Sequence, residues 1–220
     1  MTFAFLDPWE DISITRRRLP HWEQDGKTYF ITFRTIDSMP ERVVAAWRDE
    51  RDRWLGKHGI NPTDEEWHSE LGKLPGSVRY EFHSVFSERF HEFLDDCHGE
   101  CLLRQPELAA IVARGLLHFD GDRYEMGDFV VMPNHVHLLV QFLAPDQLKK
   151  QGRSWKKYMA VEINKSLGRR GHFWQGESYD HLVRGPEEFL HYREYIASNP
   201  LKAKLKSGEY WHYQSTKAPT

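Results

Sequence analysis

Two histidines, His135 and His137, lie two positions apart in an apolar run of the sequence. The apolar residues Val136, Leu138 and Val140 alternate with them, which predicts a strand with the imidazoles on one face and the aliphatic side chains on the other. Two neutral imidazoles on one face can bind a metal ion, since imidazole is a common metal ligand. A hydrogen-bonded histidine in an apolar strand is the alternative.

A second segment, residues 186–199, could add a nucleophile and a third ligand. Pro186 and the two glutamates after it are typical of a helix start, and Pro200 places the predicted end of the helix at Asn199. At about 100° per residue, the segment divides into two adjacent stripes. The first stripe is apolar and predicts core packing for Phe189, Tyr192 and Ile196; the second is polar and contains Glu188, His191, Tyr195 and Asn199.

Tyr195 and Asn199 are one helical turn apart, so their side chains share a face of the predicted helix. A cation bound by the Asn199 amide oxygen and the two histidines would therefore lie beside the Tyr195 phenol. The alternative is a solvated tyrosine and an ordinary asparagine at a helix C-terminus. The presence of both halves in one chain favours the metal site.

These motifs resemble those of a known family. Met-Pro-Asn-His-Val-His, followed by a helix with Tyr-Ile-x-x-Asn-Pro, is similar to the single-tyrosine HUH transposases of insertion sequences, and most similar to the REP-associated tyrosine transposases. The resemblance covers most of the chain outside residues 40–105, and further short motifs support it in the same order: Arg17-Arg18-Leu19-Pro20-His21-Trp22, Tyr29-Phe30-Ile31-Thr32-Phe33-Arg34, Phe173-Trp174-Gln175 and Asn199-Pro200-Leu201-Lys202-Ala203.

The resemblance implies roles for individual residues. His135 and His137 correspond to two metal ligands, and Tyr195 to the nucleophile that becomes linked to DNA. Asn199 is a less secure third ligand, because the wider superfamily often has glutamine there, and His181 is the fallback. The mixed set of imidazole and amide ligands favours Mg²⁺ or Mn²⁺ as the cofactor.

The predicted function is metal-dependent cleavage and rejoining of single-stranded DNA at hairpin-forming, repetitive extragenic palindrome-like sequences. The phenol of Tyr195 would form a 5′-phosphotyrosine, which a second 3′-hydroxyl could reseal without ATP. Cationic charge from the metal, or from Lys156 and Lys157, would help to expose the attacking oxygen. Two alternatives stay open: a hairpin-binding protein that has lost catalysis, and a metal-dependent hydrolase that does not act on nucleic acid.

Charge is segregated along the chain, although the net charge is only −3. Residues 146–206 carry a net charge of +6 and residues 40–105 a net charge of −5. Lysines and arginines interleaved with aromatic residues suit phosphate contacts and base stacking. We therefore expect DNA to be bound by Arg16, Arg17, Arg18, Lys156 and Lys157.

Composition favours a single globular domain, because 220 residues with 40% hydrophobic content can bury a sizeable core. The sequence contains neither an apolar run of about 18 residues nor a cationic-then-apolar leader, so no membrane partner and a cytoplasmic location are expected. Cys97 and Cys101 lack a second ligand pair at zinc-site spacing, so we expect idle thiols. A monomer is favoured over a homodimer.

The predicted fold class is α+β, a ferredoxin-like (RRM-like) antiparallel sheet with helices packed on it and an HUH-type catalytic core. Within one domain, 1–220, residues 1–27 would form a DNA-recognition arm, 58–100 an elaboration of the core, and 123–200 the catalytic half. Beyond the histidine strand and the tyrosine helix, the predicted elements are strands at 28–35 and 123–131, helices at 39–55, 106–117 and 154–167, and a short extended piece beginning at 171.

Overall fold

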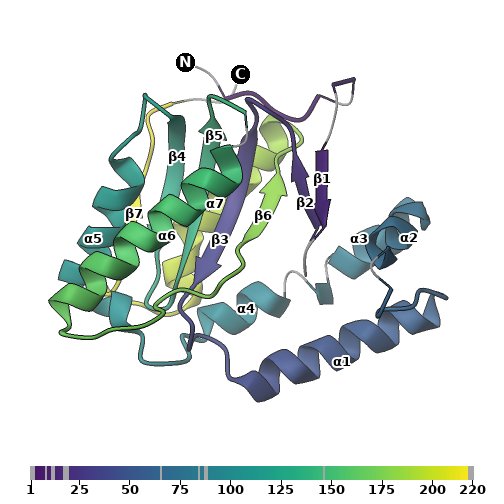
Figure 1. Ribbon diagram of the computed structural model, residues 1–220, viewed down its shortest axis with the longest axis horizontal. Coiled ribbons are helices and arrows are strands. Elements are labelled where there is room, and N and C mark those ends of the chain that lie inside the picture. The colour runs from purple at the N-terminus through teal and green to yellow at the C-terminus, as the bar shows by residue number, and fades with distance from the viewer. Residues whose placement is uncertain are drawn as a thin grey trace.

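A computed structural model of the chain describes residues 3–7, 9–10, 13–16, 20–64, 66–83, 85–86, 89–145 and 147–217. Figure 1 shows a central sheet flanked by helices, with a further group of helices beside the end of the sheet that lies away from the two termini. The elements in chain order are β1 (Ser13–Arg16), β2 (Pro20–Glu23), β3 (Thr28–Arg34), α1 (Glu41–Lys57), α2 (Trp67–Lys73), α3 (Gly76–His83), α4 (Arg89–Asp95), the 3-10 helix η2 (Leu102–Arg104), α5 (Pro106–Leu117), β4 (Tyr124–Val131), β5 (His135–Phe142), α6 (Gln147–Ser166), β6 (Tyr179–Leu182), α7 (Pro186–Lys202) and β7 (Trp211–Tyr213).

The main sheet has the order β6-β3-β5-β4-β7, and every pair in it is antiparallel. Without the short edge strand β7, the sequence of elements β3, α5, β4, β5, α6, β6 and the strand order are those of a ferredoxin-like fold. The predicted fold class, α+β with an antiparallel ferredoxin-like sheet, is therefore confirmed. The strands β1 and β2 form a separate two-stranded sheet.

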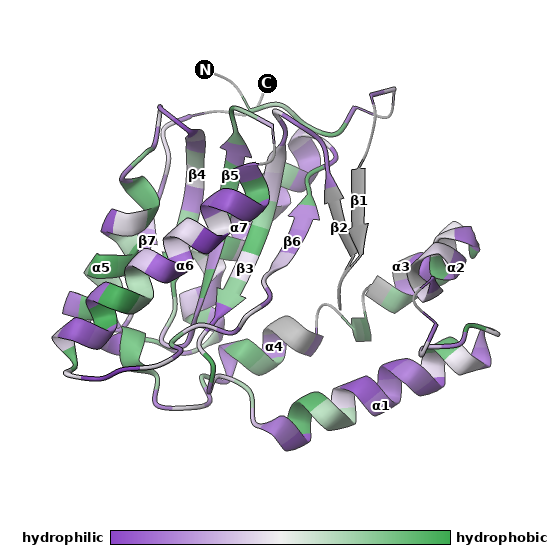
Figure 2. Ribbon diagram, viewed as in Figure 1, coloured by the Kyte–Doolittle hydropathy of each residue, from purple (hydrophilic) through white to green (hydrophobic). Residues whose placement is uncertain are grey.

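Each face of the sheet is covered by its own helices, because residues along β3, β4 and β5 alternate between two apolar clusters. Helices α5 and α6 pack on one face, over residues such as Ile31, Val136 and Leu138. Helix α7 packs on the other face, where Phe189 and Ile196 meet Phe30. Figure 2 shows hydrophobic residues concentrated in the central strands, whereas α1 is largely hydrophilic.

The segment between β3 and α5 contains α1 to α4, and its first three helices share a small apolar cluster of their own around Leu55, Trp67 and Phe82. This segment includes residues 58–100, for which an elaboration of the core remains a prediction, and it also contains α1. Its last helix, α4, returns to the sheet and brings Asp95 beside β5. Among the described helices, none combines the length and apolar character needed to cross a bilayer.

Several predicted helix boundaries were wrong. Helix α1 covers Glu41–Lys57 rather than 39–55, and the larger differences concern α6 and α7. Helix α6 begins at Gln147 rather than Ser154, because Gln151 continues the buried stripe of Trp155, Met159 and Ile163 at helical spacing. Helix α7 continues through Pro200 to Lys202. Pro200 has no N–H, so only the Ile196 carbonyl, four residues before it, loses its usual donor. The next turn is still closed by a hydrogen bond from the Ala203 N–H to the Asn199 carbonyl.

Candidate active site

The two histidines lie on β5 and point toward the face of the sheet that α7 covers. Both are fully buried, and their ring centroids are 4.6 Å apart. Val136 and Leu138 point to the opposite face and pack with α5 and α6. The predicted alternation of this strand is confirmed.

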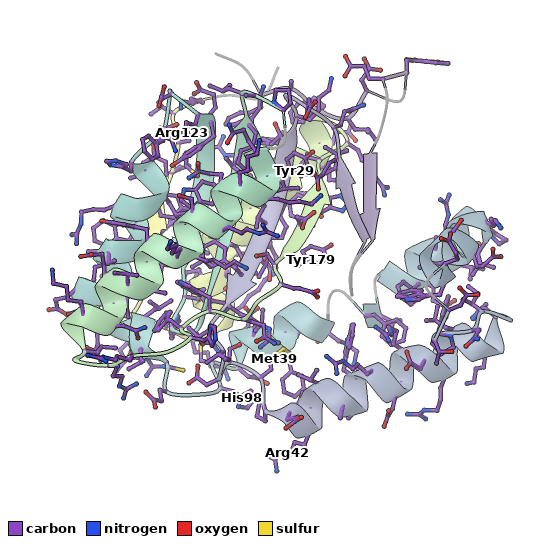
Figure 3. All side chains as sticks on the ribbon, in the orientation of Figure 1. Tyr29, Met39, Arg42, His98, Arg123 and Tyr179 are labelled. Carbon is purple, nitrogen blue, oxygen red and sulfur yellow. The ribbon has the colours of Figure 1, made fainter. Side chains whose placement is uncertain are left out.

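A hydrogen-bond relay fixes the orientation of His135. Asn134 Nδ2 donates to the carbonyl of His98 at 2.9 Å, so Asn134 Oδ1 faces His135 Nδ1, at 2.7 Å. A carbonyl oxygen only accepts hydrogen bonds, so Nδ1 of the neutral ring carries the proton and Nε2 presents a lone pair. Figure 3 shows His98 at the end of the molecule where α4 lies. Sequence reasoning missed this role of Asn134, although an amide directly before the first histidine was a usable signal.

A hydrogen bond at Nδ1 also orients His137. Its Nδ1 lies 2.7 Å from Thr32 Oγ1 on the neighbouring strand β3, and the Thr32 hydroxyl can accept a hydrogen bond from it. Its Nε2 lies 3.5 Å from the hydroxyl oxygen of Tyr195. Both histidines therefore use Nδ1 for a structural hydrogen bond and point Nε2 into the space under α7, the arrangement usual in histidine metal ligands.

Helix α7 brings Tyr195 over this space. The Tyr195 ring lies edge-on to His137, with centroids 5.1 Å apart, and Lys202 Nζ lies 4.9 Å from the ring centroid. Burial raises the pKa of the phenol, and the negative charges of Asp95 and Glu92 raise it further, while the nearby Asn199 amide lowers it. Ionisation of Tyr195 therefore requires additional positive charge near its oxygen.

Tyr192 has a different environment, although it lies on the same helix. Its ring stacks on Phe30 with centroids 4.1 Å apart, as expected for a packing residue. Phe30 in turn stacks against His137 at 5.5 Å. Only Tyr195, of these two tyrosines, has its hydroxyl at the histidine pair.

Asp95, the last residue of α4, was missed by sequence reasoning. Its Oδ1 lies 3.6 Å from Nε2 of His135. Asp95, His135 and His137 each offer one possible metal-binding atom, and these three atoms lie within 4.8 Å of one another. Among the described residues, they form the group of at least three His, Cys, Asp or Glu side chains that could hold a metal ion. Burial raises the pKa of Asp95 to about 7, and the nearby Asn199 amide and the positive charge of Lys202 oppose this rise.

Asn199 and His181, the two sequence candidates for a third ligand, occupy different places. Asn199 is fully buried and lies close enough to Asp95 and Tyr195 to lower the pKa of both groups. His181 lies on β6, where its Nε2 is 3.0 Å from Glu188 Oε1, and it is not in the cluster with Asp95. The structure thus brings Asn199, but not His181, to the histidine pair.

The expected basic residues lie elsewhere. Lys156 is on α6, across the sheet from the histidines, and its Nζ is hydrogen-bonded at 2.6 Å to the carbonyl of Gly176. Lys157 is exposed on the same helix. The expectation that these lysines lie beside the phenol is corrected: α6 packs on the other face, and Lys202 is the lysine near Tyr195. Arg16 ends β1, where only the backbone is described, and Arg17 and Arg18 lie outside the described residues.

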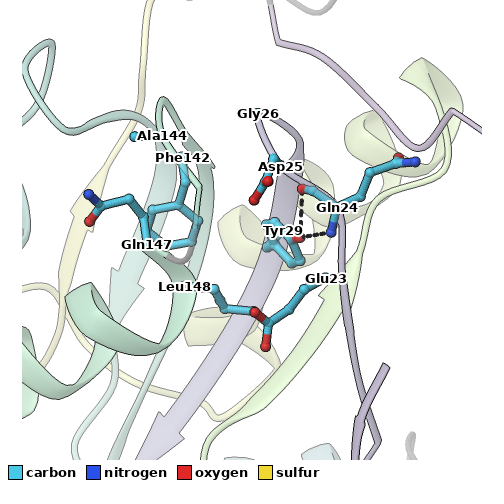
Figure 4. Close-up of a pocket in the computed structure, with 9 residues that line it drawn as sticks. All are labelled: Glu23, Gln24, Asp25, Gly26, Tyr29, Phe142, Ala144, Gln147 and Leu148. Carbon is cyan, nitrogen blue, oxygen red and sulfur yellow. Dashed lines mark hydrogen bonds between the residues drawn. The ribbon is translucent and has the colours of Figure 1, made fainter. Parts of the chain in front are cut away.

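A separate small pocket lies at the other end of β5, lined by residues that include Glu23, Gln24 and Phe142 (Figure 4). Its tyrosine, Tyr29, accepts a hydrogen bond from the Gln24 N–H at 2.7 Å and donates one to the Gln24 carbonyl at 2.9 Å. Both hydrogen bonds are local to the turn before β3, so this pocket offers a structural tyrosine rather than a second reactive one.

The residues at the histidine pair fit a divalent cation. Two imidazole nitrogens with fixed orientation and a carboxylate oxygen are the donors that Mn²⁺ and related ions accept. Asp95 Oδ1 is buried and has no hydrogen-bond partner among the described residues, as expected for an oxygen that a cation would satisfy. The donor chemistry and the burial therefore both support a metal centre here.

The comparison with protein families agrees with the motifs. The family described as "Transposase IS200 like" matches residues 112–199, a segment that contains both histidines, Tyr195 and Asn199 but not Asp95. A solved structure described as a REP-associated tyrosine transposase bound to a REP hairpin is similar over 83% of this chain and 71% of that chain, with 15% identity and a TM-score of 0.44. The comparison with curated proteins gives no match.

Proposed function

We propose, on the premise that residues 112–199 belong to the IS200-like transposase family, that this chain is a metal-dependent single-stranded DNA endonuclease and strand transferase. Its substrate is hairpin-forming DNA of the repetitive extragenic palindrome type, which the motif resemblance implies. The observation that carries the proposal is the position of the Tyr195 hydroxyl, 3.5 Å from Nε2 of His137, one of the two histidines on β5. A nucleophile beside two candidate metal ligands is the combination that phosphodiester cleavage needs.

Tyr195 is the proposed nucleophile. Its oxygen forms a bond to the scissile phosphorus, and the bond between phosphorus and the 3′-oxygen breaks. The 3′-oxygen leaves as a hydroxyl after taking up one proton, which balances the proton lost by the phenol. The product is a 5′-phosphotyrosine, and attack on it by another DNA 3′-hydroxyl reverses these changes and joins two strands.

Positive charge at the site has two sources. His135 and His137 would hold a divalent ion such as Mg²⁺ or Mn²⁺, which would supply positive charge to the reacting phosphate. The exposed Lys202 lies nearby, with Nζ 4.9 Å from the Tyr195 ring centroid. Positive charge from a bound ion would favour the ionised phenol and oppose the effect of burial, which raises its pKa.

DNA binding is proposed to use residues other than those that carry the chemistry. Lys156 and the exposed Lys157 belong to α6, and Arg16, Arg17 and Arg18 belong to the N-terminal arm. Phosphate contacts by such residues give salt-dependent affinity with little dependence on the metal. The affinity for DNA and the rate of cleavage should therefore respond to different substitutions.

Access to the site requires a movement. His135 and His137 are fully buried, and Tyr195 is largely covered. Direct contact between a phosphate and the two imidazoles would therefore require a change in the packing that covers them. This closed arrangement favours, as a second candidate, a protein that binds hairpin DNA without cleaving it.

A covalent-adduct assay separates the two candidates. Single-stranded hairpin oligonucleotides from the DNA flanking the gene are incubated with the full chain and Mn²⁺, and denaturing electrophoresis then detects protein linked to DNA. We expect an adduct with wild type and with Tyr192→Phe, but none with Tyr195→Phe, because only Tyr195 carries its hydroxyl to the histidine pair. An unshifted wild type that still binds the hairpin would support the binding-only candidate.

Histidine substitutions test the division between binding and chemistry. His135→Ala and His137→Ala should lose cleavage and keep most of the salt-sensitive affinity, since lysines and arginines supply the phosphate contacts. Electrophoretic mobility shifts at two salt concentrations measure that affinity. Equal loss of binding and cleavage in both variants would contradict the division.

A further inference from the structure

We infer that Asp95 is the third protein ligand of the metal centre, supplied by a helix outside the family-matched segment; the inference rests on the proposed metal-dependent function. Asp95 ends α4, whereas the family match begins at residue 112. The carboxylate is mostly buried, with 14% of its side chain exposed, and its Oδ1 lies 3.6 Å from Nε2 of His135. The histidine and tyrosine motifs therefore did not predict Asp95 as a ligand.

The orientation of His135 strengthens the assignment. Because Asn134 accepts from Nδ1 of the neutral ring, Nε2 presents a lone pair toward Asp95 rather than a proton. The carboxylate oxygen also presents lone pairs, so the two groups have no proton to share while Asp95 is ionised. Two acceptors placed face to face in a buried site are stabilised by a cation between them.

Asn199 has a different role in this arrangement. A carboxylate binds Mg²⁺ or Mn²⁺ through a charged oxygen, which is a stronger ligand than a neutral amide oxygen. Asn199 is fully buried near both Asp95 and Tyr195, and its amide atoms form no hydrogen bond with another described residue. We therefore assign the charged oxygen ligand to Asp95 and place Asn199 beside the ligand and the nucleophile.

The loop that follows Asp95 connects the ligand to the histidine strand a second time. The carbonyl of His98 accepts the hydrogen bond from Asn134, 2.9 Å away. Residues 95–99 thus supply one ligand, Asp95, and help to fix the orientation of another, His135. The elaboration between β3 and α5 gains a function from this, since without α4 the site would keep two imidazoles and lose its carboxylate.

Direct measurement of Mn²⁺ affinity tests the inference. Isothermal titration calorimetry and the electron paramagnetic resonance signal of free Mn²⁺ are applied to the DNA-free full chain. We expect Asp95→Asn to bind Mn²⁺ at least about tenfold more weakly than wild type, because losing a ligand costs at least as much as losing a group that orients one. The matched control is Asp96→Asn, which removes the same charge one residue away from a side chain that is 68% exposed. Its affinity should change by less than about threefold, since water and salt screen an exposed charge.

His137→Ala separates failure of the inference from failure of the proposed function. If His137→Ala weakens Mn²⁺ binding and Asp95→Asn does not, Asp95 is not a ligand and the histidine site stands. A larger loss from Asn199→Ala than from Asp95→Asn also overturns the inference, because the amide would then be the oxygen ligand. If neither His137→Ala nor Asp95→Asn changes the affinity, the proposed metal centre falls and the inference falls with it. Circular dichroism of each variant confirms that the fold is retained.

Discussion

Replacing Asn134 with alanine removes the group that sets the proton position on His135. The substitution breaks two hydrogen bonds, to His135 Nδ1 at 2.7 Å and to the His98 carbonyl at 2.9 Å. The buried imidazole N–H would lose its partner, at a cost of about 1–3 kcal/mol, and the more exposed His98 carbonyl would lose a bond worth about 0.5–1.5 kcal/mol. We expect the free energy of unfolding to fall by roughly 2–4 kcal/mol before any relaxation.

The Asn134→Ala protein should relax by a shift of the proton on His135. Without Asn134, the His135 proton can move to Nε2, where Asp95 Oδ1 lies 3.6 Å away and can accept it after a small closure. This recovers part of the lost stability but occupies the lone pair that would bind the metal. Loss of such an orienting partner typically weakens metal binding by about 10–100-fold, or about 1.4–2.7 kcal/mol.

Two measurements check this prediction. Long-range ¹H–¹⁵N spectra of histidine in the metal-free protein distinguish the two tautomers, and titration calorimetry gives the Mn²⁺ affinity. Wild type should show the proton on Nδ1 of His135, and Asn134→Ala should show a shift toward Nε2 together with weaker Mn²⁺ binding. An unchanged tautomer and an unchanged affinity in Asn134→Ala would refute the reasoning.

Two further predictions concern Asp95 and the loop behind it. In the metal-free protein, burial raises the pKa of Asp95 to about 7, so the folded state holds a proton that the unfolded state has lost. The contribution of Asp95 to the free energy of unfolding should therefore fall as pH rises from about 4 to about 7. Urea titrations in EDTA should give wild type a more negative slope of unfolding free energy against pH than Asp95→Asn, and equal slopes would contradict this. Gly99→Ala should destabilise the fold by about 2–4 kcal/mol and weaken Mn²⁺ binding, because Gly99 has φ +92° and a Cβ there would lie 2.6 Å from Asp37 Oδ2. Thermal unfolding compares it with Gly121→Ala, whose φ is +82° with nothing within 4 Å, and a similar effect of both would show that contact with Asp37 is unimportant.

The sequence predicted those parts of the site that depend on local periodicity. Alternation along β5 placed His135 and His137 on one face, and helical spacing along α7 separated Tyr195 from the packing residue Tyr192. The limits of α5 were also predicted, because Pro106 begins the helix and the apolar stripe continues to Leu117. These patterns are set within a few residues, so a single sequence carries them.

Contacts between distant segments could not be predicted in this way. Asp95 is one acid among several in α4 and its loop, 40 positions before His135, and only the return of α4 to the sheet distinguishes it. Lys156 was misplaced for a similar reason: helical periodicity shows which side of α6 is buried, but not which face of the sheet the helix covers. Pro200 was read as a helix end, although a proline in a last turn removes only one hydrogen bond.

The proposed function requires the Tyr195 oxygen to become bonded to DNA. Mass spectrometry can locate this bond by peptide mapping of the adduct, after nuclease digestion has trimmed the DNA to a short 5′-phosphorylated remnant. We expect the peptide containing Tyr195 to carry the added nucleotide mass and the other tyrosine peptides to lack it. A remnant on another residue, or cleaved DNA with no covalent remnant on the protein, would show that Tyr195 is not the nucleophile.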